Sequence, residues 1–424
     1  MTTGINRRNF VKSCAAIASF SIVPAHILRG EGAPSNQLTR ALIGFGGIAK
    51  SSNHLGYTDS RLIALCDPDA ARVKNGLAMA DKKGYGKIHG CKDFREILEM
   101  KDVDVVHICT PPHWHGIMSV LAAQAGKDVW CEKPMTRTIG EGLRVMEAVK
   151  ANGTIFRLNT WFRFMGTYYG FGTEVKPIKK VVESGALGWP LTAIVGATTG
   201  FNLKFRWSGL VNLEPQPVPE GFDYDLWLGP APFKPYHKHR THSTFRGYWD
   251  YDGGGLGDMG QHYLDPVQYL LGKDNTSPVE INIDCPPQHP DAVGSFNRIQ
   301  YKYADGCQII VDGNDSLKDV PFLQGPKGKL WPKMKSDIAN LDDILRDQPD
   351  PEPQQVDFME SIKLRRPFAL NERNGFRSCT LVNLGICAMR LGRGFKFDPV
   401  KLQAINDPAA NAFIYQQMRS PWDI

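Results

Sequence analysis

The sequence predicts an α/β protein built in two parts. Strands alternate with helices of about 10–15 residues in the first part, which is typical of a parallel sheet with right-handed crossovers. A glycine-rich turn at Gly44 follows the first strand directly. Beyond Asn159 the strand-like runs cluster, which is consistent with an α+β domain around an antiparallel sheet. We expect residues 1–37 to precede the fold, residues 38–158 to form the first domain and residues 159–424 to form the second.

Short apolar runs mark the strands of the first domain, and stretches of helical composition separate them. Asp93 stands just before one of these stretches, where its carboxylate would cap a helix. Cys66, Cys109 and Cys131 each end a predicted buried strand, where a thiol packs as a small apolar group. The predicted strands are Arg40–Ile43, Arg61–Cys66, Val103–Cys109, Asp128–Cys131 and Thr154–Leu158, and the predicted helices are Asp69–Ala80, Asp93–Met100, Pro112–Ala125 and Ile139–Ala151.

The turn after the first strand reads Gly-Phe-Gly-Gly-Ile-Ala, a G-x-G-x-x-A pattern. Its first glycine permits a tight turn, its second lets backbone approach a pyrophosphate, and its small last residue allows close helix packing. Asp67 ends the next strand, 23 residues after Gly44. A carboxylate there binds the ribose hydroxyls of NAD and repels the 2′-phosphate of NADP, although a nearby Arg or Lys could accommodate that phosphate. The alternative is that Asp67 caps the helix that follows Pro68.

Two segments with polar side chains follow later strands of the same sheet. One is Thr-Pro-Pro-His-Trp-His from Thr110 to His115, and the other is Glu132-Lys133-Pro134. Open α/β sheets bind ligands at the carboxyl ends of their strands, so both segments are placed to face a bound molecule. A lysine there could be only a solvated surface charge. Between Glu132 and Pro134, at the end of a buried strand, we expect Lys133 to face the substrate.

The second domain begins with a predicted helix and continues as strands. Its last part has the composition of two helices and a tail that packs back on the body. A proline-rich stretch lies between the predicted strands Leu191–Thr199 and Val279–Asp284 and carries many aromatic residues. These residues could cover the sheet as a structured loop, or they could stack on sugar rings. The predicted elements are helices Glu174–Ser184, Gln354–Arg366 and Phe376–Leu391, strands Leu191–Thr199, Val279–Asp284, Arg298–Tyr303 and Gln308–Val311, and the tail Arg419–Ile424; the aromatic residues are Trp207, Phe222, Tyr224, Trp227, Phe233 and Tyr236.

The segment Gly253–Asp265 carries the chemistry of the second domain. Asp258 and His262 are four residues apart, so in a helix they share one face. A histidine base beside a carboxylate that orients it is a common catalytic arrangement. The alternative is a helix start that Asp258 caps, with His262 half-buried.

These motifs together resemble the Gfo/Idh/MocA family of sugar and polyol oxidoreductases. The G-x-G-x-x-A turn, the Thr110–His115 segment, the Glu-Lys-Pro triplet and the downstream Gly-Asp-Met-Gly-Gln-His carry the resemblance. It implies a Rossmann domain followed by an open, mostly antiparallel sheet, with one face of that sheet used for a homodimer or homotetramer. It also implies a small-molecule sugar, glycoside or cyclitol as the substrate.

The resemblance assigns roles to individual residues. Lys133, Asp258 and His262 would be catalytic, with His262 as the base and Lys133 stabilising the alkoxide. Asp258 would support the proton path. The implied cofactor contacts are Gly44, Phe45, Gly46, Gly47, Ile48, Asp67, Thr110, Pro111, His113, His115, Glu132, Lys133 and Arg163, and the substrate-side candidates are Lys133, His237, Arg240, His242, Arg246, Trp249, Asp258 and His262.

The chain is near neutral apart from its start. The net charge is +6 over 424 residues, and Arg7, Arg8, Lys12 and Arg29 supply four of these charges, leaving +2 for the rest. This balance argues against nucleic-acid binding. Adjacent arginines before a short apolar stretch resemble a twin-arginine export signal, so we expect a periplasmic protein without a membrane span. No CxxC pair is present among nine cysteines, so we expect no metal site. Because cysteines end buried strands and the chain would fold in the reducing cytoplasm before export, we also expect no disulfides.

These observations and the resemblance predict an NAD(P)-dependent oxidoreductase, with NAD favoured over NADP, that transfers a hydride between the nicotinamide and a secondary hydroxyl. The nicotinamide supplies the redox chemistry, and the protein supplies positioning and electrostatics. Because little free NAD is available outside the cytoplasm, we expect the cofactor to be bound before export and recycled in place. Two alternatives remain at this point: an oxidation–elimination glycosidase or lyase on the same fold, and a protein that binds a dinucleotide or a sugar without catalysis.

Overall fold

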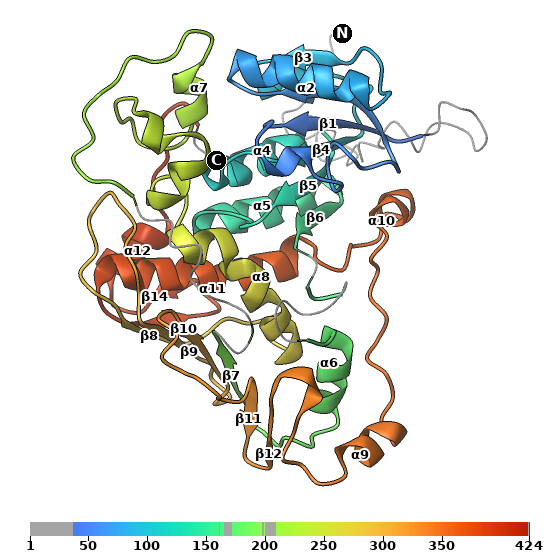
Figure 1. Cartoon of the computed structure of the whole chain (residues 1–424), viewed down its shortest axis with the longest axis vertical. Coiled ribbons are helices and arrows are strands. Elements are labelled where there is room, and N and C mark those ends of the chain that lie inside the picture. The colour runs from blue at the N-terminus through green and yellow to red at the C-terminus, as the bar shows by residue number, and fades with distance from the viewer. Residues whose placement is uncertain (1–36, 161, 165–171, 197–198, 200–208, 423) are drawn as a thin grey trace, which may run out of the picture.

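The computed structural model describes residues 37–160, 162–164, 172–196, 199, 209–422 and 424. Residues 1–36, which hold the predicted export signal and most of the linker after it, lie outside the described residues. Trp207 also lies outside them. Two sheets dominate the molecule, one in the blue and teal N-terminal half and one in the half that contains the orange strands (Figure 1). Helices of the second half lie between them.

The first sheet is parallel throughout, as predicted. Its order in the described residues is β3-β2-β1-β4-β5-β6. In the registers of the neighbouring pairs, Ile43 lies beside both Cys66 and Ile108, and Ile108 lies beside Cys131. The carboxyl ends of the central strands therefore meet at one edge. The strands are β1 Thr39–Ile43, β2 Arg61–Cys66, β3 His89–Cys91, β4 Val105–Ile108, β5 Asp128–Glu132 and β6 Phe156–Asn159.

The crossover helices begin at side-chain caps. Asp93 accepts a hydrogen bond from the Arg95 amide, which confirms it as a cap. The helix after β2 is capped by Asp69 and not by Asp67, which leaves Asp67 for another role. The predicted helix from Pro112 is a short 3-10 turn followed by an α-helix. The elements are η3 Ile48–Lys50, α2 Ala70–Lys82, α3 Phe94–Glu99, η4 Pro112–Trp114, α4 His115–Gln124 and α5 Ile139–Asn152.

The second sheet is mixed but mostly antiparallel. Its order in the described residues is β12-β11-β7-β10-β9-β8-β13-β14, and within it β10 pairs with β7 in parallel. The other described pairs of this sheet are antiparallel. The strands are β7 Thr192–Val195, β8 Glu280–Asp284, β9 Arg298–Lys302, β10 Gln308–Asp312, β11 Leu323–Gly325, β12 Gly328–Leu330, β13 Phe395–Asp398 and β14 Gln403–Ala404.

Two long helices join the halves of the molecule. The helix α11 packs against α8 of its own half and against α5 of the first half, as Figure 1 shows. The predicted helix from Gln354 begins only at Phe358, because Asp357 caps it. The helices are α6 Val175–Glu183, α7 Tyr224–Leu228, η7 Lys238–Arg240, η8 His242–Gly247, α8 Gly254–Leu270, η9 Pro332–Met334, α9 Leu341–Asp347, α10 Phe358–Leu364, α11 Glu372–Leu391 and α12 Pro408–Ile414.

The C-terminal tail packs back on the first half, as predicted. The ring of Trp422 meets that of Trp114 edge-on, with 4.8 Å between centroids. Arg419 donates from Nε to the Gly229 carbonyl at 2.9 Å. Among the described residues no helix combines the length and the apolar character needed to cross a membrane.

Candidate functional site

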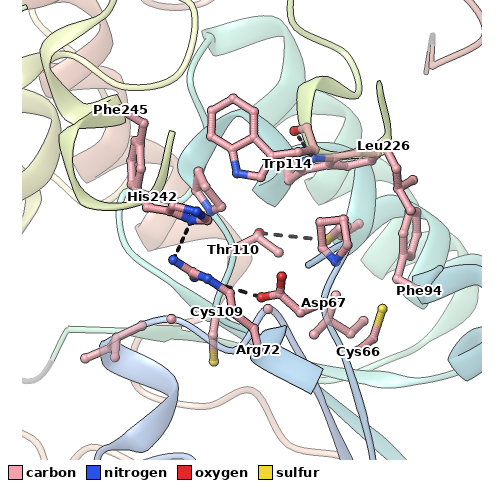
Figure 2. Close-up of a pocket in the computed structure, with 18 of the residues that line it drawn as sticks. Cys66, Asp67, Arg72, Phe94, Cys109, Thr110, Trp114, Leu226, His242 and Phe245 are labelled. Carbon is pink, nitrogen blue, oxygen red and sulfur yellow. Dashed lines mark hydrogen bonds and ion pairs between the residues drawn. The ribbon is translucent and has the colours of Figure 1, made fainter. Parts of the chain in front are cut away.

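A cavity of about 300 Å³ lies at the carboxyl ends of β1, β2 and β4. We call it the main cavity. Residues of the second half line its other side, and Figure 2 shows His242 next to the Arg72 guanidinium, with Phe245 beside His242. Its lining residues are Ile43, Gly44, Gly46, Gly47, Ile48, Cys66, Asp67, Pro68, Arg72, Lys92, Phe94, Cys109, Thr110, Pro111, Trp114, Met118, Leu226, Trp227, His242, Ser243, Phe245 and Arg246.

The glycine turn shapes one wall of the main cavity. Gly44 has a φ of +87°, and a Cβ there would lie 2.9 Å from the Thr110 amide nitrogen, so only glycine fits the turn. A Cβ on Gly47 would meet nothing within 4 Å, so this part of the turn is open. An open backbone wall after a first strand fits the pyrophosphate of a dinucleotide. Six further predicted cofactor residues line the cavity with Gly44: Gly46, Gly47, Ile48, Asp67, Thr110 and Pro111.

Asp67 lines the main cavity beside the Arg72 guanidinium. Its Oδ2 accepts from the Phe45 amide at 2.7 Å, and its Oδ1 accepts from the Asp69 amide at 3.0 Å. Burial raises the pKa of Asp67, although Arg72 and these two donors oppose the rise. Nη1 of Arg72 lies 4.0 Å from Oδ2 of Asp67, and its Nη2 lies 2.6 Å from Nδ1 of His242. A carboxylate and a cation therefore lie together in this part of the main cavity.

A second pocket of about 160 Å³ continues from the main cavity. We call it the lysine pocket. Ile48, Thr110, Phe245 and Arg246 line both spaces, so one molecule could occupy the two together. The remaining residues of the lysine pocket are Pro112, Glu132, Lys133, Asp252 and Asp258.

Lys133, Asp258 and Arg246 form a buried charged cluster in the lysine pocket. Nζ of Lys133 donates to the Asp258 carbonyl oxygen at 2.6 Å and to its Oδ1 at 3.0 Å. Nε of Arg246 lies 2.8 Å from the same Oδ1. Burial alone would raise the pKa of Asp258, but Lys133 and Arg246 hold it well below its usual range. Asp258 is therefore charged at neutral pH. It lies in the second turn of α8 and does not cap it.

His262 lies one turn further along α8 and faces Thr160. Its Nδ1 is 2.6 Å from Oγ1 of Thr160, and its ring meets Phe162 edge-on. Burial, and then the charge of Lys133, lower the pKa of His262 to about 3, so the imidazole is neutral. His262 is not one of the described residues that line the main cavity or the lysine pocket.

His113, His115 and Glu132, which were expected to contact the cofactor, make hydrogen bonds that hold the loops at the strand ends. His115 bridges the Pro134 carbonyl, 2.6 Å from Nδ1, and the Thr110 carbonyl, 2.9 Å from Nε2. Nε2 of His113 lies 3.0 Å from the Trp227 carbonyl, and burial lowers the pKa of His113 to about 3. Phe45, His113 and His115 are buried beside the cavity without lining it. Glu132 accepts from His54, at 2.7 Å, and from Asn159.

Arg163 was expected to contact the cofactor. It lines neither the main cavity nor the lysine pocket and lies instead in a buried cluster of ion pairs. Its Nη2 donates to Oδ1 of Asp265 at 2.7 Å, and its Nη1 donates to Oδ2 of Asp274 at 2.6 Å. Burial would lower the pKa of Arg163, but these two carboxylates raise it. The arrangement ties the segment after β6 to α8, which gives Arg163 a structural place.

The five substrate-side candidates that precede the glycine turn divide into two groups. His242 and Arg246 line the main cavity. The other three of these five do not: His237 caps a 3-10 turn, Arg240 pairs with Asp291 at 2.7 Å, and Trp249 donates to the His289 carbonyl at 2.9 Å.

The aromatic residues of the proline-rich stretch are mainly core. Buried rings there pack on one another with Phe245, Tyr248 and Tyr251, which supports the structural alternative for this stretch. Trp227 also reaches the main cavity, whereas Phe233 is 67% exposed on the surface. The buried members predicted from sequence are Phe222, Tyr224, Trp227 and Tyr236.

Three residues at the site escaped the sequence analysis: His54, Arg72 and Asp252. Arg72 lies five residues after Asp67, on the first turn of α2, and this spacing could have indicated it. Asp252 directly precedes the three glycines and could have been included with them. Nothing in the spacing links His54 to Glu132, which lies 78 residues later in the chain.

Family models match nearly the whole described chain. Residues 38–160 match an oxidoreductase family model described as an NAD-binding Rossmann fold, and residues 171–424 match the C-terminal alpha/beta domain of the same family. Among solved structures, the WlbA dehydrogenase from Bordetella pertussis, in complex with NADH and UDP-GlcNAcA, superposes with a TM-score of 0.57 at 18% identity. The match covers 85% of this chain and 99% of that one, and it shows a shared fold.

Curated relatives match over part of their length. The levoglucosan dehydrogenase of Pseudarthrobacter phenanthrenivorans is 28% identical over 61% of this chain and 57% of its own length. A glycosyl hydrolase family 109 protein of Stenotrophomonas maltophilia is 25% identical over 60% of this chain and 54% of its own. The chain thus spans about half the length of the curated relatives it matches. With both domain models matched in order, the chain belongs to the Gfo/Idh/MocA oxidoreductase family.

Proposed function

We propose that the protein oxidises a secondary hydroxyl of a sugar, glycoside or cyclitol with NAD. The observation that carries this proposal is the continuity of the two spaces. The main cavity runs from the glycine turn and Asp67, and the lysine pocket that extends it holds Lys133 beside Asp258. A dinucleotide placed in the first would bring its reactive end toward the second.

Within this proposal, Lys133 stabilises the charge that develops on the substrate oxygen. Its side chain is 13% exposed and fixed by two hydrogen bonds to Asp258, so its position needs no rearrangement during the reaction. A preorganised donor in a site that excludes water is worth far more than the same donor in water. The bound nicotinamide would accept the hydride.

We propose NAD over NADP because Asp67 points its carboxylate into the main cavity. Arg72 opposes this choice, since a guanidinium can bind a 2′-phosphate. In the structure, however, Arg72 is already engaged by His242 and lies near Asp69, with 3.8 Å between Nε and Oδ2. Comparing the dissociation constants of NAD and NADP tests this part. Tighter binding of NADP would overturn it.

Activity is tested with three probes of different chemistry: levoglucosan, myo-inositol and methyl β-glucoside. Protein loaded with NAD should form reduced nicotinamide with at least one of them, as measured by absorbance. No reduction with any of the three would contradict the proposed substrate class.

We also propose export by the twin-arginine route, action in the periplasm with tightly held NAD, and a homo-oligomer. The N-terminal sequence supports the export. The lining of the main cavity by residues from both halves of the chain supports a tightly held cofactor. The family resemblance supports the homo-oligomer. Fractionation of cells tests the location, dialysis tests cofactor retention, and sedimentation tests the assembly. Loss of most of the nucleotide on dialysis would refute the retention.

An oxidation–elimination glycosidase is the second candidate, favoured by the similarity to a glycosyl hydrolase family 109 protein. Such an enzyme would release the aglycone of a glycoside without net formation of reduced cofactor. Methyl β-glucoside distinguishes the two functions, because methanol release without reduced nicotinamide would support the second.

A further inference from the structure

A chain of buried polar side chains leads from the first half of the molecule to the lysine pocket. Nδ1 of His107 lies 3.1 Å from Nδ1 of His54, and Nε2 of His54 lies 2.7 Å from Oε1 of Glu132. We call these three residues the histidine chain, and all three are buried. Glu132 lines the lysine pocket, whereas His54 lines neither this pocket nor the main cavity. His54 therefore reaches the pocket only through Glu132.

The first sheet and a turn beside it place the histidine chain. His107 lies in β4 beside Trp130 of β5, and Glu132 follows Trp130 by two residues, so its side chain points to the same face of the sheet. The ring of Trp130 packs on both imidazoles of the chain. His54 lies in the turn after η3, where its carbonyl accepts from Nη2 of Arg40 at 3.1 Å. Backbone and ring contacts thus hold the imidazole of His54 in place.

The partners of the histidine chain fix where its hydrogens lie. Burial alone would raise the pKa of Glu132, but His54, followed by Lys133, holds it below its usual value. Glu132 is therefore charged and can only accept, so Nε2 of His54 donates. Burial lowers the pKa of His107 well below its usual value, so its ring is neutral and carries one hydrogen. Nε2 of His107 has no hydrogen-bond partner within the described residues, and this places the hydrogen on Nδ1, where His54 accepts it.

Two donors meet one oxygen of Glu132 and leave the other for a ligand. Nδ2 of Asn159, which ends β6 beside Glu132, donates to Oε1, as Nε2 of His54 does. In the described part of the chain, both side-chain hydrogen bonds of Glu132 thus end on Oε1. An anionic oxygen makes short, strong hydrogen bonds to donors. Oε2 therefore gives the lysine pocket an acceptor for a hydroxyl group, with its direction set by side chains outside the pocket.

The charge of Glu132 also acts on the base expected from the sequence. Burial, and then Lys133, lower the pKa of His262, and Glu132 and Asp258 oppose this effect. An ionised Glu132 therefore makes His262 a better proton acceptor than a neutral Glu132 would.

We propose that His54 is a positioning residue of the oxidation, an inference that rests on the proposed function. It keeps Glu132 ionised and turns Oε2 toward a hydroxyl of the molecule in the lysine pocket, on either the ribose of the dinucleotide or the sugar. No proton or hydride passes through His54, and Lys133 keeps the role given above. The inference thus adds a support behind the pocket and leaves the reacting groups unchanged.

Other charged or titratable groups also act on Glu132, and all of them stay in the variants below. A difference in the ionisation of Glu132 between these variants therefore reports on the histidine chain. The groups are Cys109 after β4, His115 of α4, Lys133 after β5, Arg157 of β6, Arg246 of η8 and His262 of α8.

The test compares three variants with the wild type. His54→Leu removes the donor to Glu132. His54→Gln keeps an N–H group near the place of Nε2, because the glutamine amide reaches about as far as that nitrogen. His107→Phe is the matched control, since it keeps a ring in the same core but leaves the contact of His54 with Glu132. If His54→Leu does not fold, His54→Asn removes the same donor with a shorter polar side chain.

Infrared titration measures the ionisation of Glu132 without turnover. The carbonyl band of its protonated carboxyl is identified by its absence in Glu132→Gln. In His54→Leu this band should persist to higher pH than in the wild type, because burial is then less opposed. His54→Gln and His107→Phe should stay close to the wild type. A band unmoved in His54→Leu would overturn the inference.

Binding and single-turnover measurements then find the hydroxyl that Oε2 accepts. His54→Leu should weaken NAD binding in calorimetry about 10- to 100-fold if the hydroxyl belongs to the ribose, since hydrogen bonds to charged groups have this strength. If it belongs to the sugar, the half-saturating concentration of levoglucosan, myo-inositol or methyl β-glucoside should rise by the same factor instead. His54→Gln should restore whichever value changes.

Two further outcomes would count against His54. Equal losses in His54→Leu and His107→Phe would indicate only a disturbed core, and so would a loss that His54→Gln does not restore. Unchanged NAD binding together with unchanged sugar saturation in His54→Leu would also overturn the inference. A wild type that oxidises none of the three probes would instead overturn the proposed function, while the infrared band still tests the contact between His54 and Glu132.

Discussion

Replacing Lys133 with methionine isolates the part of the site on which the proposed chemistry most depends. The substitution keeps an unbranched chain of similar length and removes the ammonium. It deletes the hydrogen bonds to the carbonyl oxygen of Asp258, at 2.6 Å, and to its Oδ1, at 3.0 Å. Arg246 stays 2.8 Å from the same oxygen, so the buried carboxylate keeps a cationic partner and the fold should survive.

The expected loss follows from the role of the missing donor. Removing one preorganised donor from a developing oxyanion costs about 10²–10³ in rate. A second effect has a definite direction. Because the charge of Lys133 lowers the pKa of both Asp252 and Asp258, its removal should raise both values. The carboxyl of Asp252 should therefore titrate above pH 7 in the variant.

Stopped-flow absorbance of NAD-loaded protein with an oxidisable probe measures the loss of rate, and titration followed by NMR measures the shift of the carboxyl pKa values. Lys74→Met, on the exposed side of α2, is the control for loss of a lysine. It should behave as the wild type does. A wild-type rate in Lys133→Met would refute the reasoning.

Three further substitutions test other parts of the structure. Asp67→Asn should weaken NAD binding about 10- to 100-fold in titration calorimetry, since hydrogen bonds to a charged group contribute about 1.5–3 kcal/mol; unchanged affinity would contradict the ribose contact. Arg163→Met should lower the free energy of unfolding by about 3–5 kcal/mol, because it leaves Asp265 buried without its partner, while NAD affinity stays as it was. Asp252→Asn should raise the melting temperature more at pH 8 than at pH 5. The folded protein holds the Asp252 proton up to about pH 7, whereas the unfolded chain loses it near pH 4, so this group's contribution to stability falls as pH rises through that window. The change is on the order of a few kcal/mol, since a tenfold change in proton affinity is worth about 1.4 kcal/mol; equal shifts at both pH values would contradict the raised pKa.

Local patterns predicted the first domain well because each of its elements has a local cause. Apolar runs became the buried strands, and Asp93 became a helix cap as its position indicated. The predicted boundary at Gln354 was wrong because Asp357 supplies the cap three residues further on. The very short strands β3 and β14 have too few residues to show a periodicity, and tertiary pairing alone defines them.

The site was predictable from local patterns mainly where its residues follow strands, whereas His242 and Arg246 came from the resemblance and Asp258 from its spacing on a helix together with the resemblance. Asp67 and Lys133 come directly after buried strands, and the parallel register brings such positions to one edge. The surroundings of Asp252 and Arg163 depend on contacts between segments far apart in the chain. Arg163 meets Asp265 from 102 residues away, and no local pattern distinguishes a cofactor contact from this buried pair. Likewise, the shared helix face of Asp258 and His262 does not reveal that Thr160 engages the imidazole.

The measurement that tests the central claim most directly is the identity of the bound nucleotide. Mature protein is purified without added nucleotide and denatured, and the released molecules are identified by chromatography with mass detection. The account predicts stoichiometric NAD or NADH from the cavity lined by Gly44, Gly46 and Asp67. A protein that releases no nucleotide and takes up neither NAD nor NADP would contradict it.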